Sequence, residues 1–152
     1  MKLTPDLREF IESLNSRAVD YVLIGGWAFG FHATPRYTGD IDFFLRCNKE
    51  NAARLKLALH DFGFTELPGF EESFLNPERI LQFGVPPNRI DILTPITGVT
   101  YDEAFASRVP GEIDGVRVPI IGRDRLIQNK GAAGRPKDLA DVDALKKTTP
   151  KR

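Results

Sequence analysis

Apolar positions along the chain switch between helical and strand spacing. The first segment has apolar residues at the i, i+3, i+4 and i+7 positions of an amphipathic helix: Leu7, Phe10, Ile11 and Leu14. Thr4 is a suitable N-cap for this helix, and Pro5 suits its first position. The apolar run 21–24, ended by two glycines, predicts a buried strand, and residues 40–46 predict a second strand.

The rest of the chain alternates helices and strands in the same way. Asn48 predicts the start of a second amphipathic helix that ends at Gly63, and Thr100 has capping-box spacing with Glu103. Pro119 favours an edge position for the strand 116–121. The remaining expected elements are a short helix over 27–32, strands over 79–83 and 89–93, and helices over 124–130 and 136–147. This order predicts an α/β or α+β fold.

Length and composition are those of an ordinary globular protein. The 152 residues predict a single domain over 1–152, with a core over about 1–95 and a C-terminal helical element over about 123–147. Twenty-one basic and 21 acidic residues leave no net charge, so no broad nucleic-acid or membrane footprint is visible. The single cysteine, Cys47, excludes a disulfide framework. Without a signal peptide or a membrane-length apolar run, we expect a cytoplasmic protein.

Three aspartates carry the chemistry that the sequence suggests. Asp40 and Asp42 alternate with apolar residues, so they point to one face of a strand, about 6.6–6.8 Å apart. Asp91 is a third acid set into an apolar strand, in the segment RIDIL. Each acid alone could be a solvated strand end. Together, on neighbouring strands, they predict a site for Mg²⁺ or Mn²⁺, whose preferred ligands are hard oxygen atoms. Two such ions, roughly 3.5–4 Å apart, align a nucleophile with a phosphate.

Gly25 and Gly26 stand between the first strand and the following helix. Glycine lets backbone N–H groups approach a phosphate closely, and a helix N-terminus favours the anion. A tight turn would explain the pair equally well. Their place upstream of the two aspartates favours a phosphate-binding role.

These residues resemble the signature of the DNA polymerase β-like nucleotidyltransferase superfamily. The segment contains GG, Ala28, His32, R-x-T at Arg36 to Thr38 and then D-x-D, which is similar to the small MNT-like and abortive-infection (AbiEii-type) branches. The tail from Lys130 to Asp141 looks like the K-x-x-A-x-R-x-K-D-x-x-D element of these proteins. The resemblance implies a mixed β-sheet with helices packed mainly on one face, and transfer of a nucleoside monophosphate from an NTP to an acceptor hydroxyl.

The resemblance also implies roles for residues. Asp40 and Asp42 would hold the metals that bridge the triphosphate. Asp91 would bind the second metal and assist deprotonation of the acceptor. Gly25 and Gly26 would cradle the β- and γ-phosphates. The second glycine replaces the serine of the common GS version, so a hydroxyl contact to phosphate is absent.

Other residues near these motifs have two interpretations each. Arg36 pairs with Asp40 or Asp42, or it reaches a phosphate, and Thr38 orders the loop by a local hydrogen bond. The cations expected at the triphosphate are Lys130 and Arg135, although both residue types also suit a solvated helix end. We interpret His32 as structural. Trp27 packs under the loop or stacks on a base, and packing is the simpler interpretation.

Two functional hypotheses follow. The first is a metal-dependent nucleotidyltransferase that uses Mg²⁺ or Mn²⁺ and an NTP, expected to be ATP, and modifies a protein, tRNA or small molecule. A partner protein from a toxin–antitoxin or phage-defence pair belongs to this hypothesis, because no acceptor-binding region is visible in the sequence. The second is a non-catalytic nucleotide-binding or antitoxin-like module of the same fold. All three aspartates are present, which favours catalysis.

Overall fold

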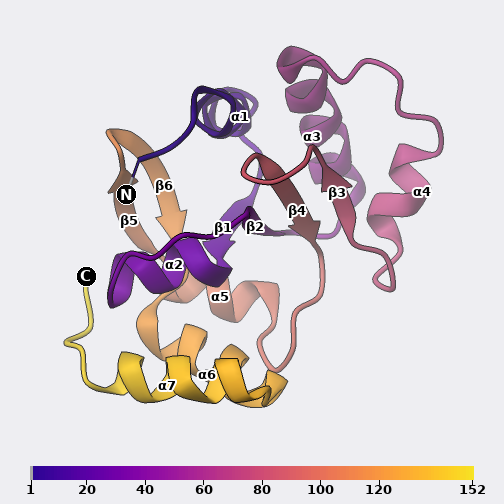
Figure 1. Ribbon diagram of the computed structural model, residues 1–152. Coiled ribbons are helices and arrows are strands. Elements are labelled where there is room, and N and C mark those ends of the chain that lie inside the picture. The colour runs from indigo at the N-terminus through magenta and orange to yellow at the C-terminus, as the bar shows by residue number, and fades with distance from the viewer. Residues whose placement is uncertain (1) are drawn as a thin grey trace.

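The computed structural model describes residues 2–152 as one mixed six-stranded sheet with helices on both sides (Figure 1). The helices are α1 (Pro5–Ser16), α2 (Gly25–His32), α3 (Lys49–Phe62), α4 (Phe70–Leu75), α5 (Tyr101–Ser107), α6 (Arg123–Ala133) and α7 (Pro136–Lys146). The strands are β1 (Tyr21–Ile24), β2 (Asp40–Leu45), β3 (Leu81–Phe83), β4 (Arg89–Leu93), β5 (Val109–Ile113) and β6 (Val116–Ile120). The α/β class predicted from the sequence is confirmed.

The strand order is β3-β4-β2-β1-β6-β5. The central strand β2 runs antiparallel to β1 and parallel to β4, and β1 runs parallel to β6. The outer strands β3 and β5 pair antiparallel with β4 and β6. The sheet therefore places β2 and β4, which carry the three aspartates, side by side.

Local sequence signals start and end the long helices as predicted. The hydroxyl of Thr4 accepts the N–H of Leu7 at 3.2 Å, and Asn48 caps α3 by accepting from Asn51. Helix α3 ends at Gly63, whose φ of 112° suits glycine. Helix α5 has the expected capping box at its start. Helix α6 runs to Ala133, beyond the predicted end, so only a two-residue turn separates it from α7.

Two elements escaped prediction, and one strand was placed wrongly. Helix α4 spans only six residues, held by the buried Phe70 and Phe74. Strand β5 contains Pro110 and Gly111, residue types depleted in strands. Because β5 covers β6, the predicted edge position of 116–121 is wrong. Pro119 is tolerated there because it faces Pro110 across the pair and the β1–β6 pairing is short.

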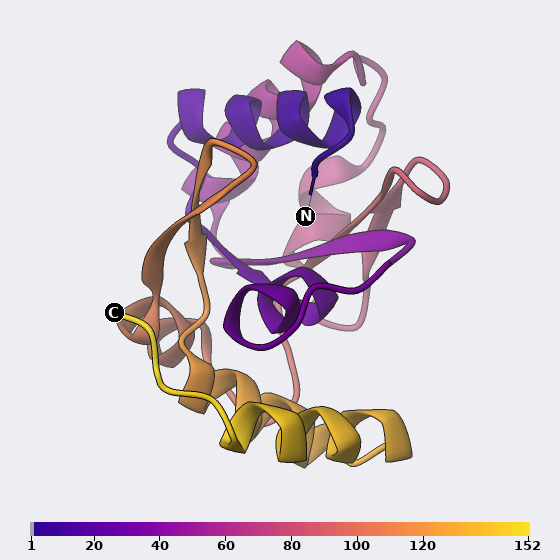
Figure 2. The same ribbon diagram turned by 60° about the vertical axis from the view of Figure 1, so that its left-hand side comes forward.

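Helices α1 and α3 pack on one face of the sheet, and α2 lies on the other, with α6 and α7 beyond it (Figure 2). Successive side chains of β2 point to opposite faces of the sheet and so contact different layers of helices. Phe43 turns to the α1 side, where its ring lies 5.6 Å from that of Phe10. Phe44 turns the other way and meets Tyr101 of α5 at 5.3 Å. Asp40 and Asp42 share the side of Phe44, so both carboxylates point away from the α1–α3 layer.

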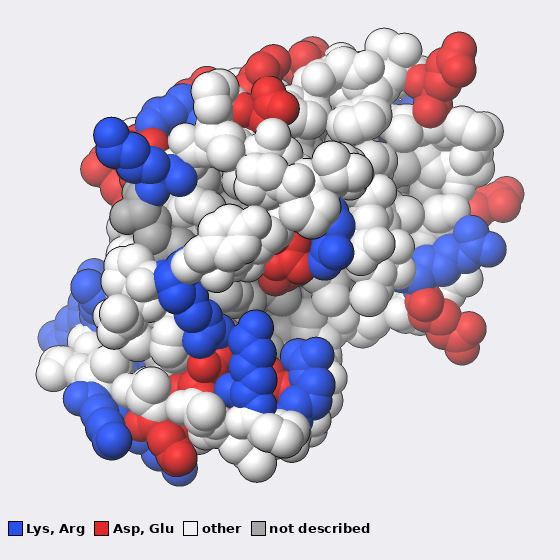
Figure 3. All heavy atoms as spheres, viewed as in Figure 1, with Lys and Arg blue, Asp and Glu red and all other residues white. Residues whose placement is uncertain are grey.

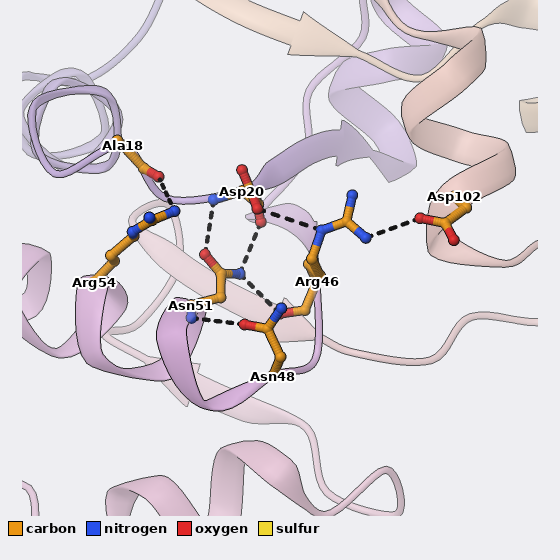
Figure 4. Close-up of polar contacts among 7 residues, drawn as sticks. All are labelled: Ala18, Asp20, Arg46, Asn48, Asn51, Arg54 and Asp102. Atoms are coloured by element: carbon orange, nitrogen blue, oxygen red, sulfur yellow. Dashed lines mark hydrogen bonds and ion pairs between the residues drawn. The ribbon is translucent and has the colours of Figure 1, made fainter.

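A buried amide joins the far ends of β1 and β2 to α3 (Figure 4). Asn51, which is 1% exposed, accepts the N–H of Asp20 at 2.8 Å and donates to the carbonyls of Asp20 and Arg46 at 3.0 and 2.8 Å. The guanidinium of Arg46 also reaches the carboxylates of Asp20 and Asp102. These contacts fix the end of the β1–β2 pair that is remote from the aspartates.

None of the helices in residues 2–152 combines the length and apolar character that crossing a membrane requires.

Candidate functional site

The pairing of β2 with β4 brings the three predicted aspartates together. Asp42 lies opposite Asp91 in the parallel register, and Asp40 lies two residues earlier on the same face. One carboxylate oxygen from each residue lies within 4.8 Å of the other two. Asp91 is buried and the other two are half-buried. The sheet alone therefore assembles a compact group of three carboxylates.

Gly25 leaves the space that Asp42 occupies. It has a φ of 69°, and a Cβ at this position would lie 2.2 Å from Oδ2 of Asp42. The neighbouring Gly26 is less constrained, since its Cβ would lie 3.4 Å from the side chain of Thr38. The sequence suggested a phosphate cradle or a tight turn for this pair. The structure shows a further reason for Gly25, because a side chain there would displace the carboxylate.

Burial, together with the neighbouring carboxylates, raises the pKa of Asp42 to about 7. Burial is the largest cause, and the charges of Asp40 and Asp91 add to it, while Arg89 acts in the opposite direction. A carboxyl group with this pKa is ionised only in part at neutral pH. The group would therefore gain from a further cation, which would compensate the mutual repulsion.

Arg89 is a site residue that the sequence analysis missed. It pairs with Asp40 across the β4–β2 register, and its guanidinium contacts Asp40 at 2.5 Å and Asp91 at 3.1 Å. The hydrogen bonds to Asp91 raise the pKa of Arg89 further above its ordinary value. A signal was present in the segment RIDIL, because Arg89 and Asp91 alternate with apolar residues and so share a face.

The loop before β2 is tied to the aspartates by Thr38. Its hydroxyl lies 3.0 Å from Oδ1 of Asp40 and 3.1 Å from the carbonyl of the same residue, which confirms the predicted local hydrogen bond. Arg36, two residues earlier, does not pair with Asp40 or Asp42. That predicted pairing is wrong, because Arg36 instead makes a bidentate ion pair with Asp141 of α7 at 2.7 and 2.8 Å.

Asp141 joins two of the predicted nucleotide-binding cations. Lys130 of α6, which is 8% exposed, contacts the same carboxylate at 2.8 Å. Burial would raise the pKa of Asp141, but the hydrogen bonds from Arg36 and Lys130 outweigh it and lower the pKa to about 2. The guanidinium of Arg36 also lies 4.1 Å from the centre of the Phe29 ring. Two cations share one anion here, which leaves a net positive charge of about one.

The other predicted residues lie around these two groups. Arg135 is largely exposed and pairs with Asp138 at 2.6 Å. His32 is buried, with Nε2 2.7 Å from the carbonyl of Ile121, and burial lowers its pKa. Trp27 packs into the core with 7% of its surface exposed. Figure 3 shows acidic atoms with basic atoms beside them near the middle of the face, and a second mixed gathering over α6 and α7.

Two cavities differ in their relation to the aspartates. One of about 410 Å³ is lined by residues of the loop before β2, including Thr38, and by Trp27. A larger one, of about 760 Å³, lies at the start of β1 and is lined by Asp20 and Tyr21 among others. None of the three aspartates lines either cavity. Only the smaller cavity includes a residue, Thr38, that contacts one of them.

The donor set of the aspartate group suits a hard divalent cation. Mg²⁺ and Mn²⁺ prefer carboxylate oxygen atoms, and each of the three residues offers such an oxygen within 4.8 Å of the other two. Three carboxylates stand beside one guanidinium, that of Arg89, so the group keeps acidic charge that a divalent cation would neutralise. The residues present therefore fit the metal that the sequence predicted.

No family model and no curated protein matches the sequence. Solved structures do match. The crystal structure of ANT(2'')-Ia in complex with adenylyl-2''-tobramycin is 15% identical, with a TM-score of 0.59 over 91% of this chain and 84% of that one. The solution structure of the antibiotic-resistance factor ANT(2'')-Ia is 14% identical, with a TM-score of 0.56 over 93% and 79%.

An antigenic nucleotidyltransferase-like protein from Paracoccidioides brasiliensis is 16% identical, with a TM-score of 0.55 over 95% of this chain and 78% of that one. Identities this low relate folds and carry no information about substrates. All three matches extend over most of both chains. The chain therefore has the mixed α/β nucleotidyltransferase fold that its motifs resemble.

Proposed function

We propose that this protein is a metal-dependent nucleotidyltransferase that moves a nucleoside monophosphate from an NTP to an acceptor hydroxyl. The observation that carries the proposal is the group of three carboxylates on parallel strands of a nucleotidyltransferase fold. Mg²⁺ or Mn²⁺ bound there would neutralise the triphosphate and help align the acceptor oxygen. ATP is the donor we expect.

The three aspartates have different proposed tasks. Asp40 and Asp42 would hold the divalent cations, which would neutralise charge on the triphosphate, and Asp91 would help to hold the second cation. Asp91 also assists removal of the acceptor's proton. The acceptor oxygen then forms a bond to the α-phosphorus, and the bond from that phosphorus to the pyrophosphate oxygen breaks. Pyrophosphate leaves with the electron pair of that bond.

The remaining predicted residues are proposed to hold the triphosphate. Gly25 and Gly26 open α2, whose N-cap position provides no side-chain hydrogen bond, so backbone N–H groups are free to donate to phosphate oxygens. Thr38 orients Asp40. The pair of cations on Asp141, Arg36 and Lys130, supplies net positive charge, and the exposed Arg135 adds to it. We propose that 1–152 acts as one nucleotidyltransferase-like domain.

The acceptor is proposed only as a class. The matched structure with adenylyl-2''-tobramycin makes a small-molecule hydroxyl one candidate, and a protein or tRNA hydroxyl is another. We further propose that this chain is of the small MNT-like or AbiEii-type branch, so that a partner protein from a toxin–antitoxin or phage-defence pair supplies or regulates the acceptor. The Gly-Gly pair and the R-x-T and D-x-D motifs support this proposal.

One observation favours a second candidate function. Arg89 already bridges Asp40 and Asp91, so the acidic group has a cation of its own. A protein in which this arrangement persisted would bind nucleotides or a partner without catalysis. The two candidates differ in whether a divalent cation reaches the aspartates.

Calorimetry with each of the four NTPs, with and without Mg²⁺, tests the proposal. The comparison is between the wild type, the double variant Asp40→Ala/Asp42→Ala and, as a control, Asp61→Ala, which removes an exposed aspartate paired with Arg17. We expect NTP binding that needs both Mg²⁺ and the two site aspartates and that persists in the control. Transfer of label from α-labelled NTP is then measured with candidate acceptors. Metal-independent binding that the double variant retains would support the non-catalytic candidate instead.

A further inference from the structure

The 760 Å³ cavity at the start of β1 has no role in the function proposed above. It opens between the C-terminal end of α1, the end of α5 and the β5–β6 hairpin, and its volume is usual for a small-molecule site. Tyr21, at one end of β1, lines it, whereas Ile24, at the other end, lies opposite Asp42. The cavity is therefore about 10 Å along β1 from the aspartates.

One face of the β5–β6 hairpin forms an apolar wall of this cavity. Pro110 and Pro119 line it and lie opposite each other across the two strands. Val19, which follows α1 and is buried, adds apolar surface on the other side. Proline rings lose no rotamer freedom when a ligand packs on them, so these walls suit an apolar body.

The guanidinium of Arg108, directly after α5, is held in place at the cavity. It lies 3.7 Å from the centre of the Phe105 ring, and its Nη1 donates to the carbonyl of Phe105 at 2.8 Å. Both residues line the cavity. Nε and Nη2 of Arg108 have no hydrogen-bond partner within residues 2–152. A guanidinium fixed in this way can donate its free N–H groups to a carboxylate or phosphate group.

The charges around the cavity leave one positive charge without a partner. Four charged side chains line it: Asp20, Arg108, Glu112 and Arg117. Asp20 is ion-paired with Arg46 at 3.3 Å (Figure 4), and Glu112 lies opposite Arg117 across β5–β6, so these charges offset one another. Arg108 pairs with no carboxylate in the part of the chain that the structure describes. The cavity therefore favours a ligand with a negative charge over a cation.

We propose that this cavity binds a small organic molecule that has an apolar body and one carboxylate or phosphate group. The anionic group pairs with the guanidinium of Arg108, and the apolar body lies against Pro110, Pro119 and Val19. Because none of the aspartates lines the cavity, this ligand is a second molecule beside the proposed NTP. The inference does not depend on the proposed transfer reaction.

Three naphthalene probes with the same ring and different charges test the site. Naphthoate, neutral naphthalenemethanol and cationic naphthylmethylamine are titrated to millimolar concentration into the ¹⁵N-labelled full chain, and amide NMR signals are followed. We expect naphthoate to bind more tightly than naphthalenemethanol and to shift amides within 18–21 and 105–118, while those of Gly25, Asp42 and Asp91 stay in place. The amine should leave the cavity amides unchanged.

Two further anions separate the possible sources of the charge. Naphthyl phosphate that binds more tightly than naphthoate would support a phosphate-bearing ligand, and the reverse order would support a carboxylate. Inorganic phosphate alone should not shift the cavity amides at the same concentration, because it has no apolar body. Equal affinities for inorganic phosphate and naphthyl phosphate would overturn the proposed ligand class.

Charge variants test the role of Arg108. Arg108→Met keeps an apolar stem over Phe105 and should weaken naphthoate binding roughly 10- to 100-fold, the range for loss of a charge-assisted hydrogen bond, without changing naphthalenemethanol binding. Glu112→Gln removes the acid opposite Arg117 and should strengthen naphthoate binding, on the order of two- to fivefold. Arg79→Met, which replaces an exposed arginine outside the cavity, is the matched control and should bind naphthoate normally.

Several results would overturn the assignment. They are the absence of anion-induced shifts at the cavity, equal affinities for naphthoate and naphthalenemethanol, and an unchanged naphthoate affinity in Arg108→Met. The double variant Asp40→Ala/Asp42→Ala should bind naphthoate as the wild type does, and loss of binding there would place the ligand at the aspartates instead. Naphthoate binding that needs Arg108, in a protein that binds no NTP, would support the cavity site and contradict only the transferase proposal.

Discussion

Arg89 and Asp40 face each other across the parallel strands β4 and β2, and their side chains meet at 2.5 Å. The same guanidinium contacts Asp91, so one cation bridges two of the three carboxylates proposed to bind metal. A divalent cation at those carboxylates would compete with it for the same oxygen atoms. Arg89 is therefore the counterion of the carboxylates when no metal is bound, and it opposes the binding of a metal ion to them.

Replacing Arg89 by methionine separates these two effects. Arg89→Met should bind Mn²⁺ more tightly, on the order of five- to tenfold, because a neighbouring positive charge is lost. Its thermal stability in a chelating buffer should be lower than that of the wild type, and Mn²⁺ should restore it. Calorimetry and thermal unfolding measure these changes. Arg54→Met, an exposed substitution on α3, is the control, and equal Mn²⁺ affinity in all three proteins would remove Arg89 from the metal site.

Asp42→Asn tests the repulsion within the carboxylate group. The pKa of Asp42 is raised, so in the metal-free protein its ionisation costs stability above about pH 7 and costs nothing below about pH 4. The variant should therefore be more stable than the wild type by about 1–2 kcal/mol at pH 8, and this gain should vanish at pH 4. Urea unfolding at both pH values measures it.

The same variant should lose metal-dependent nucleotide binding, because an amide is a weaker ligand than a carboxylate. Stability and binding therefore change in opposite directions, as expected of a residue kept for function. Asp143→Asn on the surface of α7 should alter neither. A less stable Asp42→Asn protein at pH 8 would show that the carboxylate is not strained in the folded state.

Gly25→Ala should be far more damaging than an alanine at a comparable turn glycine. Both Gly25 and Gly63 have positive φ, so alanine costs about 1–2 kcal/mol at either position through backbone strain. At Gly25 the new methyl group would also collide with Oδ2 of Asp42, whereas Gly63 has nothing within 4 Å. We expect a total loss of about 2–4 kcal/mol for Gly25→Ala.

The two glycine variants also differ in function. Gly25→Ala should lose metal binding because Asp42 must move, while Gly63→Ala should keep the wild-type affinity. Denaturant unfolding and Mn²⁺ calorimetry on the pair measure both effects. Equal losses of stability in the two variants would mean that the carboxylate of Asp42 moves aside freely and that Gly25 is needed for its backbone conformation alone.

The sequence was most informative where short-range periodicity decides the outcome. Alternation within β2 was enough to put Asp40 and Asp42 on one face, and capping residues defined the starts of α1, α3 and α5. Asp91 joins them through the register of β4 with β2. The pairing of Arg89 with Asp40 depends on the register between two strands 49 positions apart, which no local pattern specifies. Strand β5 was missed because its stability comes from β6, whereas its own Pro110 and Gly111 disfavour a strand.

The ion-pair partner of Arg36 also could not be predicted from the local sequence. Proximity in sequence to Asp40 and Asp42 suggested a pairing, but the bidentate partner is Asp141, 105 positions away. The lysine of the tail motif, Lys130, contacts the same carboxylate. The R-x-T motif and the C-terminal element therefore meet at the carboxylate of Asp141. This contact depends on the packing of α6 and α7 beside α2.

Asp141→Asn tests whether this contact fixes the C-terminal helices to the loop before β2. The pKa of Asp141 is lowered to about 2, so its ion pairs stabilise the protein above about pH 4, and the stabilisation is lost as the pH falls through about 2. At pH 7 the variant should be less stable by about 2–4 kcal/mol, because Lys130 stays buried without an anionic partner. The difference should shrink near pH 2, where the wild-type carboxyl becomes protonated.

Urea unfolding at pH 7, 4 and 2 measures this convergence, with Asp143→Asn on the same helix expected to follow the wild type throughout. A constant difference at all three pH values would mean that Asp141 acts through packing and not through its charge.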